Sequence, residues 1–251
     1  MLTSQRKKLI LERLRRDGQI IAKNLSSELE LSEDTIRRDL RELAAEGLLQ
    51  RVHGGALPAS PAIADLSARQ KIGTDGKTAI GRAAAKMIQP GQIVILDGGT
   101  TAVQLARHLP LELNATVITH SPSIAVELEH HRQLEVILLG GRLFKHSMVA
   151  VGAATIAAIA QIRADTYFMG ATGIHPQVGL TTGDLEEAHV KRALMNSAAE
   201  SIALASSEKL NAASPYQIAP LEELSGIITS RDVPDDVTTA FEKLGITLTR
   251  A

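Results

Sequence analysis

Apolar residues recur at helical spacing in three stretches near the start of the chain, at residues 3–16, 21–30 and 32–47. Ser32 is suited to cap the amino end of the third stretch, and Gly47 is a residue type common at helix carboxyl ends. Because only a few residues separate the second and third stretches, the pattern predicts a helix-turn-helix whose second member is the recognition helix.

The third stretch is amphipathic, with Ile36, Leu40 and Leu43 on one face and basic side chains on the opposite face. A short apolar segment with Arg51, His53 and two glycines follows and predicts a β-hairpin wing. Long arginine side chains reach phosphates and guanine edges, although a solvated helix face is the alternative on this pattern alone. The residues that we expect to contact DNA are Ser32, Glu33, Asp34, Thr35, Arg37, Arg38, Arg41, Arg51 and His53.

Seven short apolar runs, separated by helical patterns, follow in the rest of the chain. They lie at residues 92–97, 115–119, 134–139, 165–170, 201–205, 225–229 and 246–249. Runs of β-branched and apolar residues without clean alternation are typical of parallel strands buried on both faces. The pattern therefore predicts an α/β domain with a mostly parallel sheet, and ligands at the carboxyl ends of its strands.

Composition excludes several classes of protein. The 251 residues include no Cys, 2 Tyr, 3 Phe and no Trp, which excludes disulfide scaffolds and thiolate metal sites and disfavours base-stacking RNA platforms. The eight His residues lack metal-ligand spacing, so we expect no metal site. No apolar run approaches the roughly 18 residues of a membrane-spanning helix, and no signal peptide is evident, so we expect a soluble, cytoplasmic protein without a membrane partner.

Charge is distributed unevenly along the chain. Residues 1–55 contain 11 Lys/Arg and 9 Asp/Glu, a net +2, whereas residues 56–251 contain 16 and 19, a net −3. Residues 1–16 alone hold six basic residues and one acidic residue, which points to a polyanion such as DNA. Residues 57–64 carry two Pro and no charge, the composition of a stiff connector. We therefore expect a winged helix-turn-helix domain at 1–57, a linker at 58–74 and an α/β domain at 75–251.

A glycine-rich turn follows the first apolar run and opens a helix, in the order Asp97, Gly98, Gly99, Thr100, Thr101. Glycines let the backbone approach a ligand closely, and a helix amino terminus favours negative charge, so this turn suits a phosphate. An ordinary strand-to-helix turn is the alternative. Neither G-x-G-x-x-G nor G-x-x-x-x-G-K-[ST] is present, so we expect no nucleotide cofactor, and indeed no cofactor of any kind.

Further polar or glycine positions follow other runs or lie on nearby helices: Ser121, Gly140, Gly141, Glu187, Lys191 and Lys209. Several such turns at the same edge of one sheet favour a shared pocket. For Glu187 and Lys191 the alternative is an exposed i,i+4 salt bridge, and for Lys209 a solvated surface lysine.

Residues 32–56, SEDTIRRDLRELAAEGLLQRVHGGA, closely resemble the winged helix-turn-helix of the DeoR/GlpR-type bacterial transcriptional regulators. The resemblance continues through Arg69, Lys77 and the segments LDGGTT, T-H-S, LLGG-R, MGATGI, GLTTGDLEEAHVK and ALASSEK. It implies that the TIRRDL helix enters the major groove of DNA. It also implies a sensor domain with the fold of ribose-5-phosphate isomerase, in which Arg69, Lys77 and the residues of the glycine-rich turn bind a phosphorylated sugar.

Three positions depart from the family pattern. Ser206 stands where the family has the Asp of D-x-S-K, His120 where it has the Asn of T-N-S, and Ser230 where it has the Asp of I-T-D. Loss of an acidic hydroxyl-binding group implies either a different sugar or a weaker response.

The resemblance implies a DNA-binding repressor of a carbohydrate-utilisation operon, controlled by a phosphorylated sugar or polyol. Its partners would be a double-stranded DNA operator and a second copy of itself, as a homodimer or homotetramer. A sugar-phosphate isomerase or deaminase with Asp97, His120 and Glu187 as acid–base groups is the competing class. We expect no enzyme, because Ser206 removes a carboxylate beside Lys209. A constitutive DNA-binding protein, whose affinity no metabolite changes, is a third class.

Overall fold

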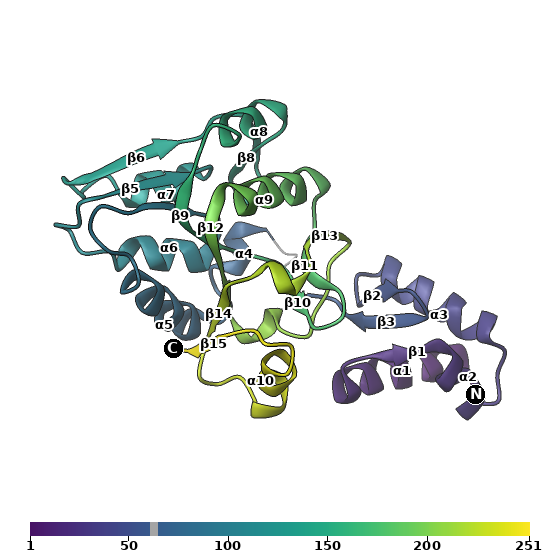
Figure 1. Ribbon diagram of the computed structural model, residues 1–251. Coiled ribbons are helices and arrows are strands. Elements are labelled where there is room, and N and C mark those ends of the chain that lie inside the picture. Colours follow the sequence, from purple (N-terminus) through teal and green to yellow (C-terminus); the bar gives the residue numbers. More distant parts are fainter. Residues whose placement is uncertain (61–64) are drawn as a thin grey trace.

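The computed structural model describes residues 1–60 and 65–251, so residues 61–64 of the expected linker lie outside the described residues. Figure 1 shows a small helical part, which contains the amino terminus, beside a larger α/β part, which contains the carboxyl terminus. The strands of the large part that lie nearest the small part are β10 (Gly173–His175) and β11 (Gly179–Thr182).

The small part is a winged helix-turn-helix, as the sequence predicts. Its elements are α1 (Thr3–Asp17), β1 (Ile20–Ile21), α2 (Ala22–Glu28), α3 (Glu33–Ala45), β2 (Leu49–Val52) and β3 (Gly55–Pro58). Ser32 caps α3, with its hydroxyl accepting a hydrogen bond from the Thr35 amide at 3.2 Å. The strands pair in the order β1-β3-β2, and β2 and β3 form the wing. Gly55 allows β1 to approach, because a Cβ there would lie 1.8 Å from the Ile20 carbonyl oxygen.

A buried ion pair ties the first and third helices together. The Arg6 guanidinium of α1 donates to the carboxylate of Asp39 on α3, and the two residues are 5% and 0% exposed. They lie beside an apolar core to which Ile10, Ile36 and Leu40 contribute. Asp39 belongs to the TIRRDL segment, but its place in the structure is inside the domain.

Most basic residues of α1 have acidic partners within the small domain. Lys7 pairs with Glu42 and Glu46, Lys8 with Glu12, Arg13 with Glu28, and Arg16 with Asp17. The charge excess of residues 1–16 is therefore largely compensated by residues that follow in the sequence. Thus α1 does not present the free basic surface that its own sequence suggests.

The large domain is built on a seven-stranded sheet in which every neighbouring pair is parallel. Its order is β15-β14-β12-β9-β4-β5-β6. The strands are β4 (Ile93–Leu96), β5 (Ala115–Thr119), β6 (Leu134–Leu138), β9 (Ala164–Met169), β12 (Ala198–Ala205), β14 (Gly226–Thr229) and β15 (Leu248–Arg250). Each corresponds to one of the seven apolar runs, and the predicted parallel sheet is confirmed.

Helices cover both faces of this sheet. On one face α5 (Thr74–Ala85), α6 (Thr100–Arg107) and α7 (Pro122–Glu127) pack on a core that includes Val94 and Leu96. On the other face α8 (Ala153–Ile159), α9 (Leu185–Ser197) and α10 (Asp235–Glu242) pack on a core that includes Ile95. Successive residues of β4 thus enter opposite cores, which explains its unbroken apolar sequence.

The large domain also contains short elements that the sequence pattern did not predict. They are the antiparallel sheet of β10, β11 and β13 (Tyr216–Ala219), the hairpin of β7 (Arg142–Phe144) and β8 (Val149–Val151), and the 3₁₀ turns η2 (Ser207–Lys209) and η3 (Leu221–Glu223). The helix α4 (Leu66–Arg69) leads into the large domain. Its Leu66 amide donates to the His146 carbonyl in the β7–β8 turn at 3.0 Å.

The residues that leave the wing attach directly to the large domain. The Pro58 carbonyl accepts a hydrogen bond from the Ala213 amide at 3.2 Å, and Ala59 forms a β-bridge with Ala213. The Ser60 hydroxyl donates to the Thr172 carbonyl. We call residues 58–60 the wing exit. The two domains are therefore joined by backbone contacts as well as by the chain.

The buried ion pair of the small domain leads to a stability prediction. Asp39→Asn leaves the Arg6 guanidinium buried without a counter-charge, so we expect the free energy of unfolding to fall by about 3–5 kcal/mol. Asp17→Asn, which removes an exposed partner of Arg16, is the matched control and changes stability by less than about 1 kcal/mol. Urea denaturation followed by circular dichroism measures both, and equal effects of the two substitutions would contradict the assignment.

Candidate functional site

The first candidate site is a groove on the small domain, between α3 and the wing. Its volume is about 470 Å³, and it is lined by Asp34, Thr35, Arg37, Arg38, Arg41 and Arg51. Arg38, Arg41 and Arg51 are exposed, and no ion pair involves them within residues 1–60 and 65–251. The fold thus brings Arg51 from β2 beside the arginines of α3. The groove is basic, which suits contact with the phosphates of a nucleic acid.

The other expected DNA-contacting residues occupy different places. Glu33 accepts from Arg37 at 2.7 Å, so the two form an i,i+4 ion pair at the start of α3. Ser32 is the cap of the same helix, and His53 is exposed in the wing turn without lining the groove.

The second candidate site lies at the point where the order of the parallel sheet reverses. Strands β4 and β9 are neighbours, but β4 continues to β5 on one side and β9 to β12 on the other. Side chains and turns that follow the two strands therefore face a common crevice at their carboxyl ends, where α/β sheets bind ligands. The Asp97 to Thr101 turn follows β4, and Gly170 to Thr172 follow β9.

A small cavity of about 20 Å³ occupies this crevice, and we call it the cradle. Eight of the expected effector residues line it: Arg69, Gly98, Gly99, Thr100, Thr101, Glu187, Lys191 and Lys209. Its lining also includes Ser147, Thr172 and Thr182, which the sequence analysis did not select. Thr172 lies inside a segment that matches the family pattern, so the sequence could have indicated it as a site residue. Ser147 lies in the β7–β8 turn, where no sequence motif indicated a site.

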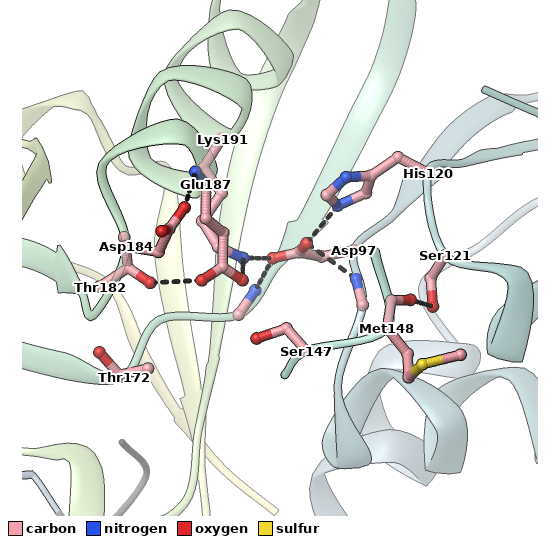
Figure 2. A network of polar contacts seen from close by, with 12 residues as sticks. Asp97, His120, Ser121, Ser147, Met148, Thr172, Thr182, Asp184, Glu187 and Lys191 are labelled. Atoms are coloured by element: carbon pink, nitrogen blue, oxygen red, sulfur yellow. Dashed lines mark hydrogen bonds and ion pairs between the residues drawn. The ribbon is translucent and has the colours of Figure 1, made fainter. Parts of the chain in front are cut away.

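Asp97 forms a buried network directly beneath the cradle (Figure 2). Its carboxylate accepts hydrogen bonds from Lys191 of α9, from His120 Nε2 at 2.8 Å and from the Gly170 amide at 2.7 Å. It also accepts from the Gly98 amide at 2.8 Å. Asp97 is 0% exposed and does not line the cavity. Its hydrogen bonds to Lys191, Gly170 and Gly98 fix the positions of residues that do.

The charge of this network is set by two opposing effects. Burial alone would raise the pKa of Asp97, but the attraction of Lys191 and the hydrogen bond from His120 hold that pKa well below its usual range. Burial likewise opposes the charge of Lys191, yet the attraction of Asp97 and Glu187 raises its pKa overall. Asp97 is therefore an anion, and Lys191 a cation, at neutral pH.

Besides Asp97, four expected effector residues lie outside the cradle lining. Lys77 donates to the carbonyls of Arg69, at 3.0 Å, and of Ile72, so it fixes the backbone that carries Arg69. The Ser121 hydroxyl donates to the Met148 carbonyl at 3.1 Å. Gly140 and Gly141 pack against Thr155 of α8: its hydroxyl donates to the Gly140 carbonyl at 2.9 Å, and a Cβ on Gly141 would meet its oxygen at 2.0 Å.

The glycine-rich turn opens α6 toward the cradle. Gly99 has φ of 110°, a conformation that L side chains rarely adopt, and a Cβ on Gly98 would lie 2.2 Å from Val149. The Thr101 hydroxyl is buried and has no hydrogen-bond partner among the described residues. The first amides of α6 and this hydroxyl are therefore available for a ligand.

Two further cations face the cradle without being neutralised as Lys191 is. Burial lowers the pKa of Lys209 to about 8, and within residues 1–60 and 65–251 its ammonium makes no hydrogen bond. Burial also lowers the pKa of Arg69, whose Nε is buried without a partner in the described part of the chain. Its other contact is a 3.4 Å hydrogen bond to the Ser147 hydroxyl.

The three departures from the family pattern are buried polar residues. Ser206 donates to Glu208 at 2.7 Å, and Glu208 also approaches Lys77 at 3.7 Å. A carboxylate two residues further along thus lies next to the position where the family pattern has Asp. Ser230 packs against Gly76, where a Cβ would lie 3.1 Å from its own. His120 belongs to the network of Asp97.

The described residues lack two other kinds of feature. They contain no group of three or more His, Cys, Asp or Glu arranged to hold a metal ion. Outside residues 61–64, no helix combines the length and apolar character needed to cross a membrane.

The Asp97 network predicts a large loss of stability when its charge is removed. Asp97→Asn removes the nearer of the two carboxylates that pair with the buried Lys191 ammonium and leaves only Glu187, at 3.7 Å. We therefore expect the free energy of unfolding of the large domain to fall by about 3–5 kcal/mol. Glu127→Gln, which weakens a more exposed pair with Arg107, is the control and costs less than about 1 kcal/mol. Circular dichroism in urea measures both; a change at Asp97 no greater than the control would remove its central role.

Comparison with known proteins agrees with this architecture. The model of the DeoR-like helix-turn-helix domain matches residues 6–61, and that of the DeoR C terminal sensor domain matches residues 73–231. The HTH-type transcriptional regulator GlpR of Haloferax volcanii is 34% identical over 250 residues, which cover 99% of this chain and 98% of that protein. The HTH-type transcriptional repressor GlcR of Bacillus subtilis is 35% identical over 233 residues, 92% and 90% of the two chains.

Solved structures that resemble the chain include ribose 5-phosphate isomerase A of Methanocaldococcus jannaschii, with a TM-score of 0.41 and 18% identity over 54% of each chain. The sequence matches extend over both domains, and the matched proteins are named transcriptional regulators. The chain belongs to the DeoR family of helix-turn-helix transcriptional regulators.

Proposed function

We propose that this protein represses a carbohydrate-utilisation operon and is released from its DNA operator by a phosphorylated sugar or polyol. The observation that carries the proposal is the cradle, where Arg69, Lys209 and the amino end of α6 converge in a chain that also has a basic helix-turn-helix groove. Two partially desolvated cations and free helix amides are the chemistry that binds a phosphate dianion.

The arrangement of the cradle supports binding more than catalysis. Asp97 and His120 are each 0% exposed and already bonded to protein groups, so they do not reach into the cavity as an acid–base pair must. Glu187 lines the cavity, but its carboxylate accepts from Thr182 at 2.7 Å and pairs with Lys191. We therefore propose a sensor that is not an isomerase or deaminase.

In the DNA complex, we propose that Thr35, Arg37 and Arg38 contact the major groove, while Arg41, Arg51 and His53 contact phosphates. The exposed basic side chains of the groove support these roles. Ser32 would act by capping α3, so that the helix begins at the correct residue. Asp34 and the Glu33–Arg37 pair would set operator preference, because a carboxylate accepts from cytosine N4 and the pair orients the guanidinium.

Release requires that the effector prefers one arrangement of the two domains. Arg69 lines the cradle and is carried by the segment that follows the wing exit. Thr172 also lines the cradle, and its carbonyl holds Ser60 of the wing exit. An effector that moves Arg69 or Thr172 therefore acts on both ends of the connection between wing and sensor. We propose this connection as the route of coupling, and a homodimer or homotetramer as the form that binds a repeated operator.

A DNA-binding experiment tests the proposed function. Fluorescence anisotropy with DNA from upstream of the protein's own operon, at one fixed salt concentration, should show binding that one phosphorylated sugar abolishes and its unphosphorylated parent does not. Arg38→Ala should weaken DNA binding by about 5- to 150-fold, since it removes a groove contact of about 1–3 kcal/mol. Arg82→Ala, on the exposed side of α5, is the control and should have no effect. DNA binding that no phosphorylated compound alters would contradict effector control.

The lowered pKa of Lys209 leads us to expect that effector binding depends on pH. The ammonium is charged below its pKa of about 8 and loses its proton above it, so affinity for a phosphate should fall about tenfold per pH unit from pH 8 upward. Calorimetric titration of the releasing compound between pH 7 and 9.5 measures this slope. Lys209→Met should bind weakly at pH 7 and without the slope, whereas the exposed Lys86→Met should retain the wild-type profile. The same slope in Lys209→Met would exclude this lysine as its origin.

A further inference from the structure

A second hollow, of about 200 Å³, adjoins the cradle. Its lining consists of Phe144, His146, Ser147, Thr172, Gly183, Asp184 and Glu187. Three of these residues, Ser147, Thr172 and Glu187, also line the cradle, so the two spaces share a wall. Figure 2 shows the three side chains near one another, with Asp184 at the start of α9 beyond Glu187.

We propose that this hollow holds the carbon skeleton of the effector and makes the protein selective for sugar phosphates of hexose size over three-carbon phosphates. The inference rests on the proposed function, because it takes the phosphate to occupy the cradle. The hollow has about ten times the volume of the cradle and shares three lining residues with it. A larger hollow of about 600 Å³ beside α6 and α7 shares Thr100 alone with the cradle. A three-carbon skeleton would leave much of the smaller hollow filled with water and would not contact all of its lining residues.

The lining of the hollow has the chemistry that recognises a carbohydrate. The rings of Phe144 and His146 lie 5.7 Å apart with an angle of 31° between their planes, and both are at least partly exposed, so they offer aromatic surface to the C–H groups of a sugar. Asp184 and Glu187 line the same hollow, and their carboxylate oxygens accept hydrogen bonds from hydroxyl groups. Aromatic surface and carboxylate acceptors in one hollow suit a polyhydroxylated ring or chain.

Asp184 has one carboxylate oxygen that is available to accept a hydrogen bond from a ligand. One of its oxygens caps α9 by accepting from the Glu187 amide at 2.9 Å, and the other makes no hydrogen bond within the described residues. Glu187 is instead held between Thr182 and Lys191. Because the cap fixes the Asp184 side chain, its second oxygen is positioned before the ligand arrives, which favours selective binding.

Asp184→Asn tests recognition of the ligand without removing the cap of α9. The amide oxygen of Asn retains the cap of α9, while the negative charge that accepts from sugar hydroxyls is lost. Asp165→Asn is the matched control: Asp165 accepts from the Ile93 amide at 2.8 Å, at the start of β9 and at the opposite end of the sheet. Phe144→Leu removes the ring and keeps an apolar side chain as a second, independent test of the hollow.

Calorimetric titration of the full chain with inorganic phosphate, glycerol 3-phosphate and a set of hexose 6-phosphates decides the question. We expect at least one hexose phosphate to bind ten or more times tighter than glycerol 3-phosphate. Asp184→Asn and Phe144→Leu should weaken its binding about tenfold and leave inorganic phosphate unchanged, and Asp165→Asn should leave all affinities unchanged.

Two results would overturn the inference while leaving the proposed function intact. One is glycerol 3-phosphate binding as tightly as every hexose phosphate and releasing DNA. The other is an equal loss of affinity for all phosphates, inorganic phosphate included, in Asp184→Asn, which would mean that Asp184 acts only through α9 on the cradle. Failure of every phosphate to bind would instead overturn the proposed function, and the inference with it.

Discussion

The buried negative charge of Asp97 is the constraint on which the sensor domain depends. An isolated carboxylate in the interior is unstable, so the structure surrounds it with Lys191 from α9, His120 after β5, and the amides of Gly98 and Gly170. These groups follow or face three adjacent strands and one helix. The hydrogen bonds to this one carboxylate therefore fix the carboxyl ends of β4, β5 and β9 relative to α9. Residues that follow β4 and β9, together with Glu187 and Lys191 of α9, line the cradle.

The same constraint divides the cations near the cradle into two kinds. Lys191 is neutralised by Asp97, so its charge is used to hold the structure together. Within the described residues Lys209 and Arg69 form no ion pair, and burial lowers the pKa of both. On the proposed function, a phosphate would supply a counter-charge to these two desolvated cations. The energy of binding would then come from pairing them, and the Asp97–Lys191 pair would stay intact.

Local sequence patterns predicted the main elements well, because each buried strand is a short apolar run and each helix has its own amphipathic period. They failed where the answer depends on distant partners. Nothing near Lys7 or Arg13 indicates that Glu42, Glu46 and Glu28 neutralise them. Likewise, no local pattern distinguishes Lys77, which binds backbone carbonyls, from Lys209, which faces the cradle. The small strands outside the parallel sheet are too short to show a period.

On the proposed function, the connection between the domains would couple operator binding to effector binding. The wing flanks the basic groove of the small domain and continues into the wing exit, residues 58–60. The wing exit is bonded to Ala213 and Thr172 of the large domain. Thr172 is in turn a wall of the cradle and exchanges a hydrogen bond with Ser214 at 2.7 Å. A shift of this wall cannot leave the wing exit undisturbed without breaking those bonds. By linkage, if DNA favours one position of the wing and the effector another, each must weaken the binding of the other by the same factor. The affinity of the sensor for its ligand would then depend on whether the operator is occupied.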